Sequence, residues 1–147
     1  MGVEVAMVGS LAEARHVQGE FERAGGQDFL AAAAELERFF TLTTHTSQPL
    51  AMISKNIDLL WHKLLECTEF YREFCQSRFG QFIDHRPRTA ATPVPEVAVR
   101  NFYGEYARHF GTVGDLWERD APPALVAYGR GVTEKLGEAR WSGWPGR

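Results

Sequence analysis

Apolar residues recur at three- and four-residue spacing along most of this chain, which is the pattern of amphipathic helices. The clearest stripe, within residues 29–44, consists of Phe29, Ala32, Ala33, Leu36, Phe39 and Phe40. A second stripe consists of Ile53, Ile57, Leu60, Trp61 and Leu64. The alternation typical of a β-strand occurs only in residues 3–8, which we interpret as an arm or the lead into a helix. The spacing therefore predicts an all-α fold.

Capping residues and helix breakers divide this pattern into separate helices. Ser10 and Asp28 are typical N-caps, and Pro49 suits the first turn of a helix. Thr68, followed by an acid, predicts that a new helix starts there after a kink or break. The expected helices cover residues 11–24, 29–44, 49–67, 68–79, 96–110 and 124–140.

The last expected helix is weakened by three glycines, at positions 129, 131 and 137. We therefore expect a compact single-domain bundle of five to six helices that spans residues 1–147. Residues 1–9 and 141–147 lack a helical pattern and are expected to be extended or disordered. Residues 84–95, rich in proline, are expected to form a long loop.

Charge and composition argue against several function classes. The net charge is −3 and no long basic block occurs, so nucleic-acid binding is not expected. No apolar run reaches the length of a membrane span, and the N-terminus does not resemble a secretion signal. A cytoplasmic protein without membrane or nucleic-acid partners is the simplest reading. No glycine-rich phosphate motif follows a strand, so no nucleotide cofactor is expected.

The two cysteines are expected to be reduced. If one helix carried both Cys67 and Cys75, the eight residues between them would separate their Cα atoms by about 12 Å. The Cα atoms of a disulfide lie about 4.4 to 6.8 Å apart. A bridge would therefore require the chain to fold back between the two residues.

Asp58, His62 and Glu66 lie four residues apart in succession, which places them on one face of a helix. A carboxylate bonded to an imidazole fixes its tautomer and raises its basicity. Such a pair suits a metal ligand, a general base or a plain structural hydrogen bond, and the sequence leaves these alternatives open.

His85 is the second histidine of interest. Gly80 permits a sharp turn, so the segment after it is expected to fold back and carry His85 toward His62. His62, His85 and Asp58 are therefore the candidate catalytic residues, and the two histidines are candidate ligands of zinc or iron, although their spacing matches no established ligand motif. The other candidate ligand-binding residues are Trp61, Glu66, Tyr71 and Cys75.

Three of these last four candidates, Trp61, Tyr71 and Cys75, also have structural readings. Trp61 belongs to the core stripe, and Cys75 lies four residues after Tyr71 in an aromatic stripe, where a cysteine usually behaves as a small apolar residue. On a straight helix Cys75 would lie about 20 Å from His62, and only the break expected at Thr68 would bring them together.

The order of these residues resembles a known family. The motifs are Asp58-x-x-Trp61-His62, Thr68-x-x-Tyr71-x-x-Phe74-Cys75 and Phe79-Gly80-x-Phe82-Ile83-x-His85-x-Pro87, with Ser47 before them and Tyr106-x-x-x-Phe110-Gly111 and Trp117 after them. Over residues 47–117 they resemble glycine-rich domain-containing protein-like sequences. The resemblance implies a small helical protein of mostly unassigned function. Many relatives have further histidines in this block, where this chain has Lys63 and Asp84.

Two functions follow as expectations. The first is a helical protein with a polar pocket around Asp58, His62 and His85, beside an aromatic core, that binds a small ligand or a metal, as a biosynthetic or accessory enzyme. The alternative is a non-catalytic interaction module in which the Trp-His block is structural. In that reading Trp141 and Trp144 dock a protein partner, because tryptophan is enriched at binding hot spots. The sequence leaves the oligomeric state open.

Overall fold

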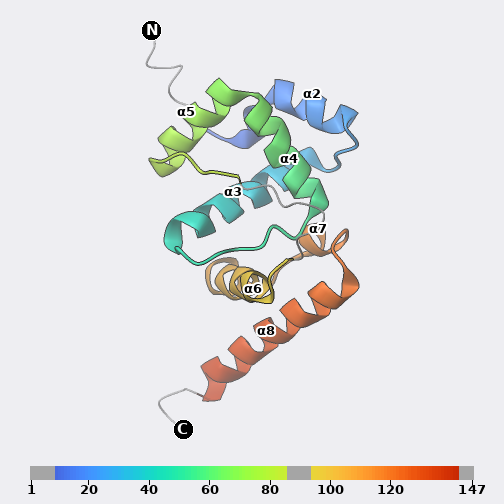
Figure 1. Ribbon diagram of the computed structural model, residues 1–147, viewed down its shortest axis with the longest axis vertical. Helices are drawn as coiled ribbons and strands as arrows, with labels where there is room; N and C mark the ends of the chain where they lie inside the picture. Colours follow the sequence, from blue (N-terminus) through green and yellow to red (C-terminus); the bar gives the residue numbers. More distant parts are fainter. Residues whose placement is uncertain (1–8, 86–93, 143–147) are drawn as a thin grey trace. The chain divides into compact units, whose positions relative to one another are not determined.

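The computed structural model describes residues 9–85 and 94–142, and side chains as far as residue 137. It contains one 3-10 helix and seven α-helices, which Figure 1 traces in chain order. They are η1 (Leu11–Glu13), α2 (Arg15–Arg23), α3 (Phe29–His45), α4 (Lys55–Glu66), α5 (Thr68–Phe79), α6 (Glu96–Phe110), α7 (Asp115–Glu118) and α8 (Pro123–Ser142). The described part of the chain contains no β-strand, so the fold is all-α.

The expected count of five to six helices is wrong, because the described residues contain seven α-helices. The additional helix is α7, which has only four residues, begins after Gly114 and buries Trp117. Four residues are too few to show helical periodicity, so the apolar pattern did not reveal it. The helix expected over residues 11–24 is also divided, because the backbone of Ala14 leaves the helical conformation between η1 and α2.

Residues 49–54 form no helix, although the apolar stripe and Pro49 predicted one from residue 49. The backbone N–H of Ala51 donates a hydrogen bond to the carbonyl of Ala98 over 3.1 Å. The side-chain amide of Asn101 donates to the carbonyl of Pro49 over 3.1 Å. Both partners lie on α6, so tertiary hydrogen bonds satisfy these two backbone groups without a helix.

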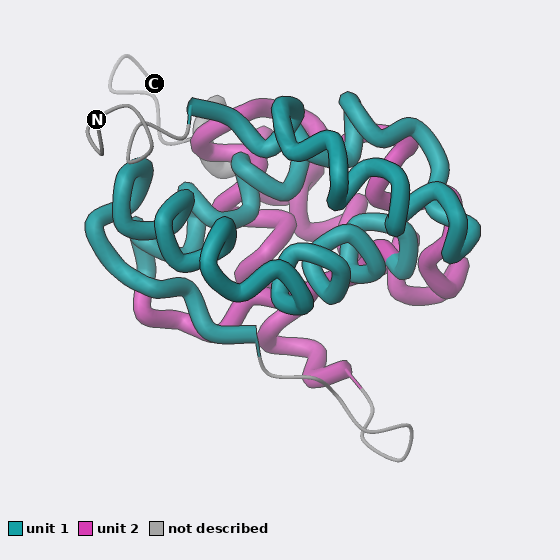
Figure 2. The backbone as a smooth tube through the Cα atoms, turned by 90° about the horizontal axis from the view of Figure 1, so that it is seen from above, with its two compact units in different colours: residues 1–46, 55–89 teal, residues 47–54, 90–147 magenta. Residues whose placement is uncertain are grey.

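The chain divides into two compact units that alternate along the sequence, as the two colours of Figure 2 show. Unit 1 comprises residues 1–46 and 55–89, and unit 2 comprises residues 47–54 and 90–147. Unit 1 therefore contains η1 and α2 to α5, whereas unit 2 contains α6 to α8. That residues 1–147 form one domain stays a prediction.

Aromatic side chains fill the core of unit 1. Phe40 on α3 is fully buried, and the centroids of four rings from α4 and α5 lie 5.1 to 6.3 Å from its own. The four surrounding rings belong to Trp61, Tyr71, Phe74 and Phe79. Burying a side chain of this size contributes about 1.5–3 kcal/mol, so these contacts hold α4 and α5 against α3.

Unit 2 packs around Trp117, which is fully buried with its ring centroid 4.7 Å from that of Phe102 on α6. The helix α8 approaches α6 closely at Gly129. A Cβ atom at this position would lie only 2.1 Å from the ring of Tyr103. Glycine at position 129 is therefore needed for packing, even though it weakens the helix.

The C-terminal helix extends further than the pattern indicated. α8 runs to Ser142, so it includes the first two residues of the segment 141–147 that was expected to be extended or disordered. Residues 143–147, including Trp144, lie outside the described residues, as do residues 1–8 of the expected N-terminal arm. The side chain of Trp141 is likewise not described, so the docking role of the two tryptophans stays a prediction.

Candidate functional site

The helix α4 presents Asp58 and His62 on one face, as their four-residue spacing predicted. The Oδ2 atom of Asp58 lies 3.2 Å from Nε2 of His62. Ile57, Leu60, Trp61 and Leu64 occupy the buried face of the same helix. The amphipathic pattern of α4 therefore anchors it in the core while Asp58 and His62 remain at the edge of that core.

His85 reaches this face from a different segment. The break expected at Thr68 is confirmed, because α4 ends at Glu66 and α5 begins at Thr68. The turn expected at Gly80 is also present, since this residue ends α5 with a left-handed φ of 70° that glycine adopts without strain. Nε2 of His85 then lies 2.8 Å from Oδ1 of Asp58.

A chain of buried hydrogen bonds holds the His85 segment in place. The indole Nε1–H of Trp61 donates to the hydroxyl of Tyr71 over 2.9 Å, and that hydroxyl donates to the backbone carbonyl of Ile83. The ring of His85 stands edge-on to Trp61, with centroids 4.4 Å apart and an interplanar angle of 85°. Trp61, on α4, thus supports His85 directly by ring packing and indirectly through Tyr71 and Ile83.

Burial raises the pKa of Tyr71 well above its usual range near 10. The phenol therefore stays protonated at physiological pH and remains able to donate to Ile83. Sequence reasoning assigned Tyr71 to a ligand pocket and missed this anchoring role. The signal available was the combination of a Trp and a Tyr in apolar stripes, because a buried indole N–H or phenol usually finds a hydrogen-bond partner.

The side chains of Asp58, His62 and His85 form one group, which we call the Asp-His-His cluster. One potential ligand atom from each lies within 4.8 Å of the others, and no other group of three or more His, Cys, Asp or Glu residues converges in this way in the described parts of the chain. The side chain of His85 is 6% exposed, whereas Asp58 and His62 are 34% and 45% exposed. One side of the cluster is therefore packed on the core and the other faces solvent.

Two of the other candidates lie outside the cluster. Glu66 is exposed at the end of α4, and its carboxylate lies 3.5 Å from the ammonium of Lys63. Cys75 is fully buried in the aromatic core, and burial raises the pKa of its thiol. A protonated, buried thiol behaves as a small apolar side chain. Among the described contacts, Glu66 forms an ion pair and Cys75 packs in the core. Their ligand-binding roles stay predictions.

Both cysteines are free, with Cys75 buried and Cys67 partly exposed. Within the described residues, no helix is long and apolar enough to cross a membrane.

A family model described as UCP032817-like matches residues 11–98, which is more than half of the chain. The chain belongs to the UCP032817-like family. The match contains all three members of the Asp-His-His cluster together with Trp61 and Tyr71, and it ends near the start of α6. No curated protein and no solved structure matches the chain. Membership of the UCP032817-like family assigns no activity to the chain.

Proposed function

We propose that unit 1 binds a divalent transition-metal ion, zinc or iron, through Asp58, His62 and His85, and that the metal in turn holds a small molecule. The observation that carries the proposal is the approach of three potential ligand atoms to within 4.8 Å of one another from two separate segments of the chain. Two imidazoles and one carboxylate are the donor set of many zinc enzymes and of non-haem iron(II) oxygenases.

The separations between donor atoms suit a shared metal. Two ligands that each lie about 2.0–2.1 Å from a metal, at angles between octahedral and tetrahedral, are roughly 2.9–3.4 Å apart. Oδ1 of Asp58 lies 2.8 Å from Nε2 of His85, and the other oxygen, Oδ2, lies 3.2 Å from Nε2 of His62, so each imidazole faces a different oxygen of the carboxylate. Both distances also fit hydrogen bonds, so the competing reading is a structural aspartate that accepts from two histidines. Metal titration distinguishes the two readings.

The exposure of the cluster favours a site that receives a ligand over a purely structural one. Structural zinc sites are closed by four protein ligands, whereas catalytic sites keep a position for water or substrate. Here three side chains converge and two of them, Asp58 and His62, are partly exposed on the solvent side. A bound zinc or iron ion would supply a Lewis acid at that position. Trp61 and Tyr71 hold the His85 segment by ring packing and through the carbonyl of Ile83, so they would orient one ligand without bonding to it.

We also propose that the helical region of this chain is related to glycine-rich domain-containing protein-like sequences. The motif Asp58-x-x-Trp61-His62 and the later His85 support it, because these are the residues that carry both the resemblance and the cluster. The relationship concerns the helical region alone.

The test is metal binding by protein purified without a histidine tag. We expect about one zinc or iron(II) ion per chain after dialysis against the metal, measured by elemental analysis and titration calorimetry. His62→Ala and His85→Ala should each weaken binding by tenfold or more, because each removes one of three protein ligands. Cobalt(II) substitution then reports the coordination geometry through its visible absorption.

His16→Ala is the matched control. This histidine is exposed on α2 of unit 1 and lies outside the cluster, so its removal should leave the metal affinity unchanged. The proposal fails if the wild-type protein takes up no metal, or if His16→Ala weakens binding as much as His62→Ala does. Circular dichroism of each variant separates a lost ligand from a lost fold.

A further inference from the structure

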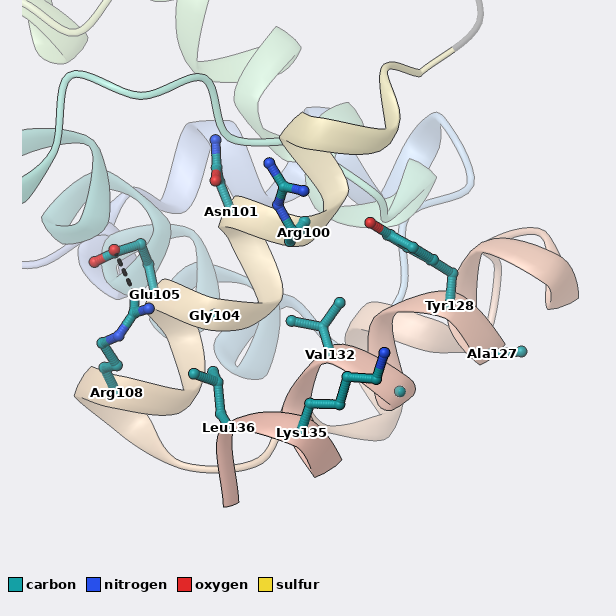
Figure 3. A pocket seen from close by; sticks show the side chains of 11 residues that line it. Arg100, Asn101, Gly104, Glu105, Arg108, Ala127, Tyr128, Val132, Lys135 and Leu136 are labelled. Atoms are coloured by element: carbon teal, nitrogen blue, oxygen red, sulfur yellow. Dashed lines mark hydrogen bonds and ion pairs between the residues drawn. The ribbon is translucent and has the colours of Figure 1, made fainter. Parts of the chain in front are cut away.

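A cleft with a volume of about 650 Å³ lies between α6 and α8 within unit 2 (Figure 3). Cavities of roughly 300–1,000 Å³ are typical of small-molecule sites. Its apolar lining includes Val132 and Leu136, and the ring of Tyr128 extends from α8 toward α6 in the same view. All lining residues belong to unit 2, so the cleft is separate from the Asp-His-His cluster of unit 1.

The charges around the cleft are unbalanced. Arg100, Arg108 and Lys135 line it together with a single carboxylate, that of Glu105. The carboxylate of Glu105 lies 2.7 Å from Arg108, so it neutralises that guanidinium. Arg100 and Lys135 are exposed and make no ion pair with any described residue. Two cations that are unpaired among the described residues therefore border an apolar cleft in a chain whose net charge is −3.

A glycine of α8 contributes to the open space. Gly131 lines the cleft, and a Cβ atom added there would meet nothing within 4 Å. Glycine in a helix interior is destabilising, and the close contact with Tyr103 that explains Gly129 has no counterpart at Gly131. The missing side chain at position 131 leaves room at the wall of the cleft.

We propose that this cleft binds a small organic anion with an aromatic or aliphatic body. Its negative group would lie at one of the two cations that border the cleft, Arg100 on α6 or Lys135 on α8, and its body would pack on Tyr128, Val132 and Leu136. An inorganic anion would use the cations and leave the apolar wall without a partner, whereas a neutral apolar molecule would leave the two cations unused. The combination of both features selects the amphipathic anion. This proposal does not depend on the metal site.

The first arm of the test fills the cleft. The probe is 1-anilinonaphthalene-8-sulfonate, an aromatic anion whose fluorescence rises on binding. Gly131→Leu should abolish its binding to the folded protein, because the new side chain extends into the open space. Gly137→Leu is the matched control, since it lies on the same helix, also has nothing within 4 Å and does not line the cleft. Equal binding by both variants, or equal loss in both, would overturn the proposal.

The second arm removes the charge. Arg100→Gln combined with Lys135→Gln should lower the affinity for the sulfonate probe by about tenfold or more. A hydrogen bond to a charged group is worth roughly 1.5–3 kcal/mol, and 1.4 kcal/mol corresponds to a tenfold change in affinity. Binding of the uncharged analogue N-phenyl-1-naphthylamine should change less than twofold.

The control for this arm makes the same change in net charge within unit 1, by combining Arg15→Gln with Arg72→Gln, two exposed arginines. It should leave binding of both probes unchanged. A loss in the control as large as in the cleft variant would mean that only the overall charge matters, which overturns the proposal. So would an equal loss of the charged and uncharged probes in the cleft variant.

Discussion

Tyr71→Phe is the sharpest test of how the fold supports the Asp-His-His cluster. The substitution keeps the ring in the core and removes one oxygen. That oxygen accepts from Nε1 of Trp61 over 2.9 Å and donates to the carbonyl of Ile83. The variant therefore leaves one buried donor and one buried acceptor without their partner, while the packing around Phe40 changes little.

The magnitude follows from these two groups. An unsatisfied buried donor or acceptor costs about 1–3 kcal/mol. The indole N–H of Trp61 is enclosed and should lose the full amount, whereas the Ile83 carbonyl belongs to an irregular segment that can shift toward water. We therefore expect the free energy of unfolding to fall by about 2–4 kcal/mol. Released from its anchor, His85 should also hold a metal about 10–100-fold more weakly.

Urea denaturation and metal titration measure the two effects, and Tyr128→Phe provides the control. Tyr128 has no hydrogen bond within the described residues, so removing its hydroxyl should change the free energy of unfolding by no more than about 0.5 kcal/mol in either direction. The reasoning is refuted if Tyr71→Phe is no less stable than Tyr128→Phe, or if it loses stability but binds the metal as the wild type does.

The same residue predicts an alkaline limit of stability. The pKa of Tyr71 is raised in the folded protein by burial, so the unfolded chain releases its proton first as the pH rises. The contribution of the protonated phenol is fully present below the unfolded pKa, near 10, and decreases above it. Stability measured between pH 9 and pH 11 should therefore decline more steeply in the wild type than in Tyr71→Phe, by about 1.4 kcal/mol in total over this range, because the unfolded phenol is half ionised near pH 10.

Three further outcomes are expected. Gly129→Ala should destabilise the protein by about 1–3 kcal/mol in urea denaturation, because its Cβ would overlap the buried ring of Tyr103, whereas Gly137→Ala should stabilise it by about 1 kcal/mol. A thiol reagent should modify Cys67 in the folded protein but reach Cys75 only after unfolding, so two equally reactive thiols would contradict the burial described. Metal uptake by the Asp-His-His cluster should weaken as the pH is lowered in calorimetric titrations, because protons compete for the imidazole nitrogens.

Local patterns predicted those parts of the site that depend on helix geometry. The face shared by Asp58 and His62 follows from the four-residue period alone. A hydroxyl residue followed by an acid indicated the break at Thr68, although the hydroxyl does not cap α5 and donates instead to the carbonyl of Leu65. The turn at Gly80 could likewise be predicted, because it depends on one glycine. Each of these features is set by residues within a few positions of one another.

Features set by distant partners were not predictable in the same way. The segment 49–54 has an apolar stripe that suits a helix, but bonds to Ala98 and Asn101 on α6 hold it in another conformation. α7 exists because Trp117 is buried against α6, and four residues show no period of their own. In both cases tertiary contacts outweigh the local propensity.

The glycines of α8 show how one local rule can hide two different structural roles. From the sequence, Gly129 and Gly131 only weaken a helix. In the structure, Gly129 allows α8 to approach Tyr103, and Gly131 leaves room at the wall of the cleft. The two roles differ because the two glycines lie on different sides of α8 relative to α6. The sequence alone does not reveal which side of α8 faces α6.

The family match separates the two proposed sites. Residues 11–98 include the Asp-His-His cluster and the Trp61–Tyr71–Ile83 hydrogen bonds that support it, whereas every residue that lines the cleft lies beyond position 98. The proposed metal site therefore lies within the region that the family model matches, and the proposed anion site lies outside it. Since the two sites share no residue, His85→Ala should leave the sulfonate probe bound and Gly131→Leu should leave the metal bound. A loss of both functions in either variant would instead point to one shared site and contradict this division.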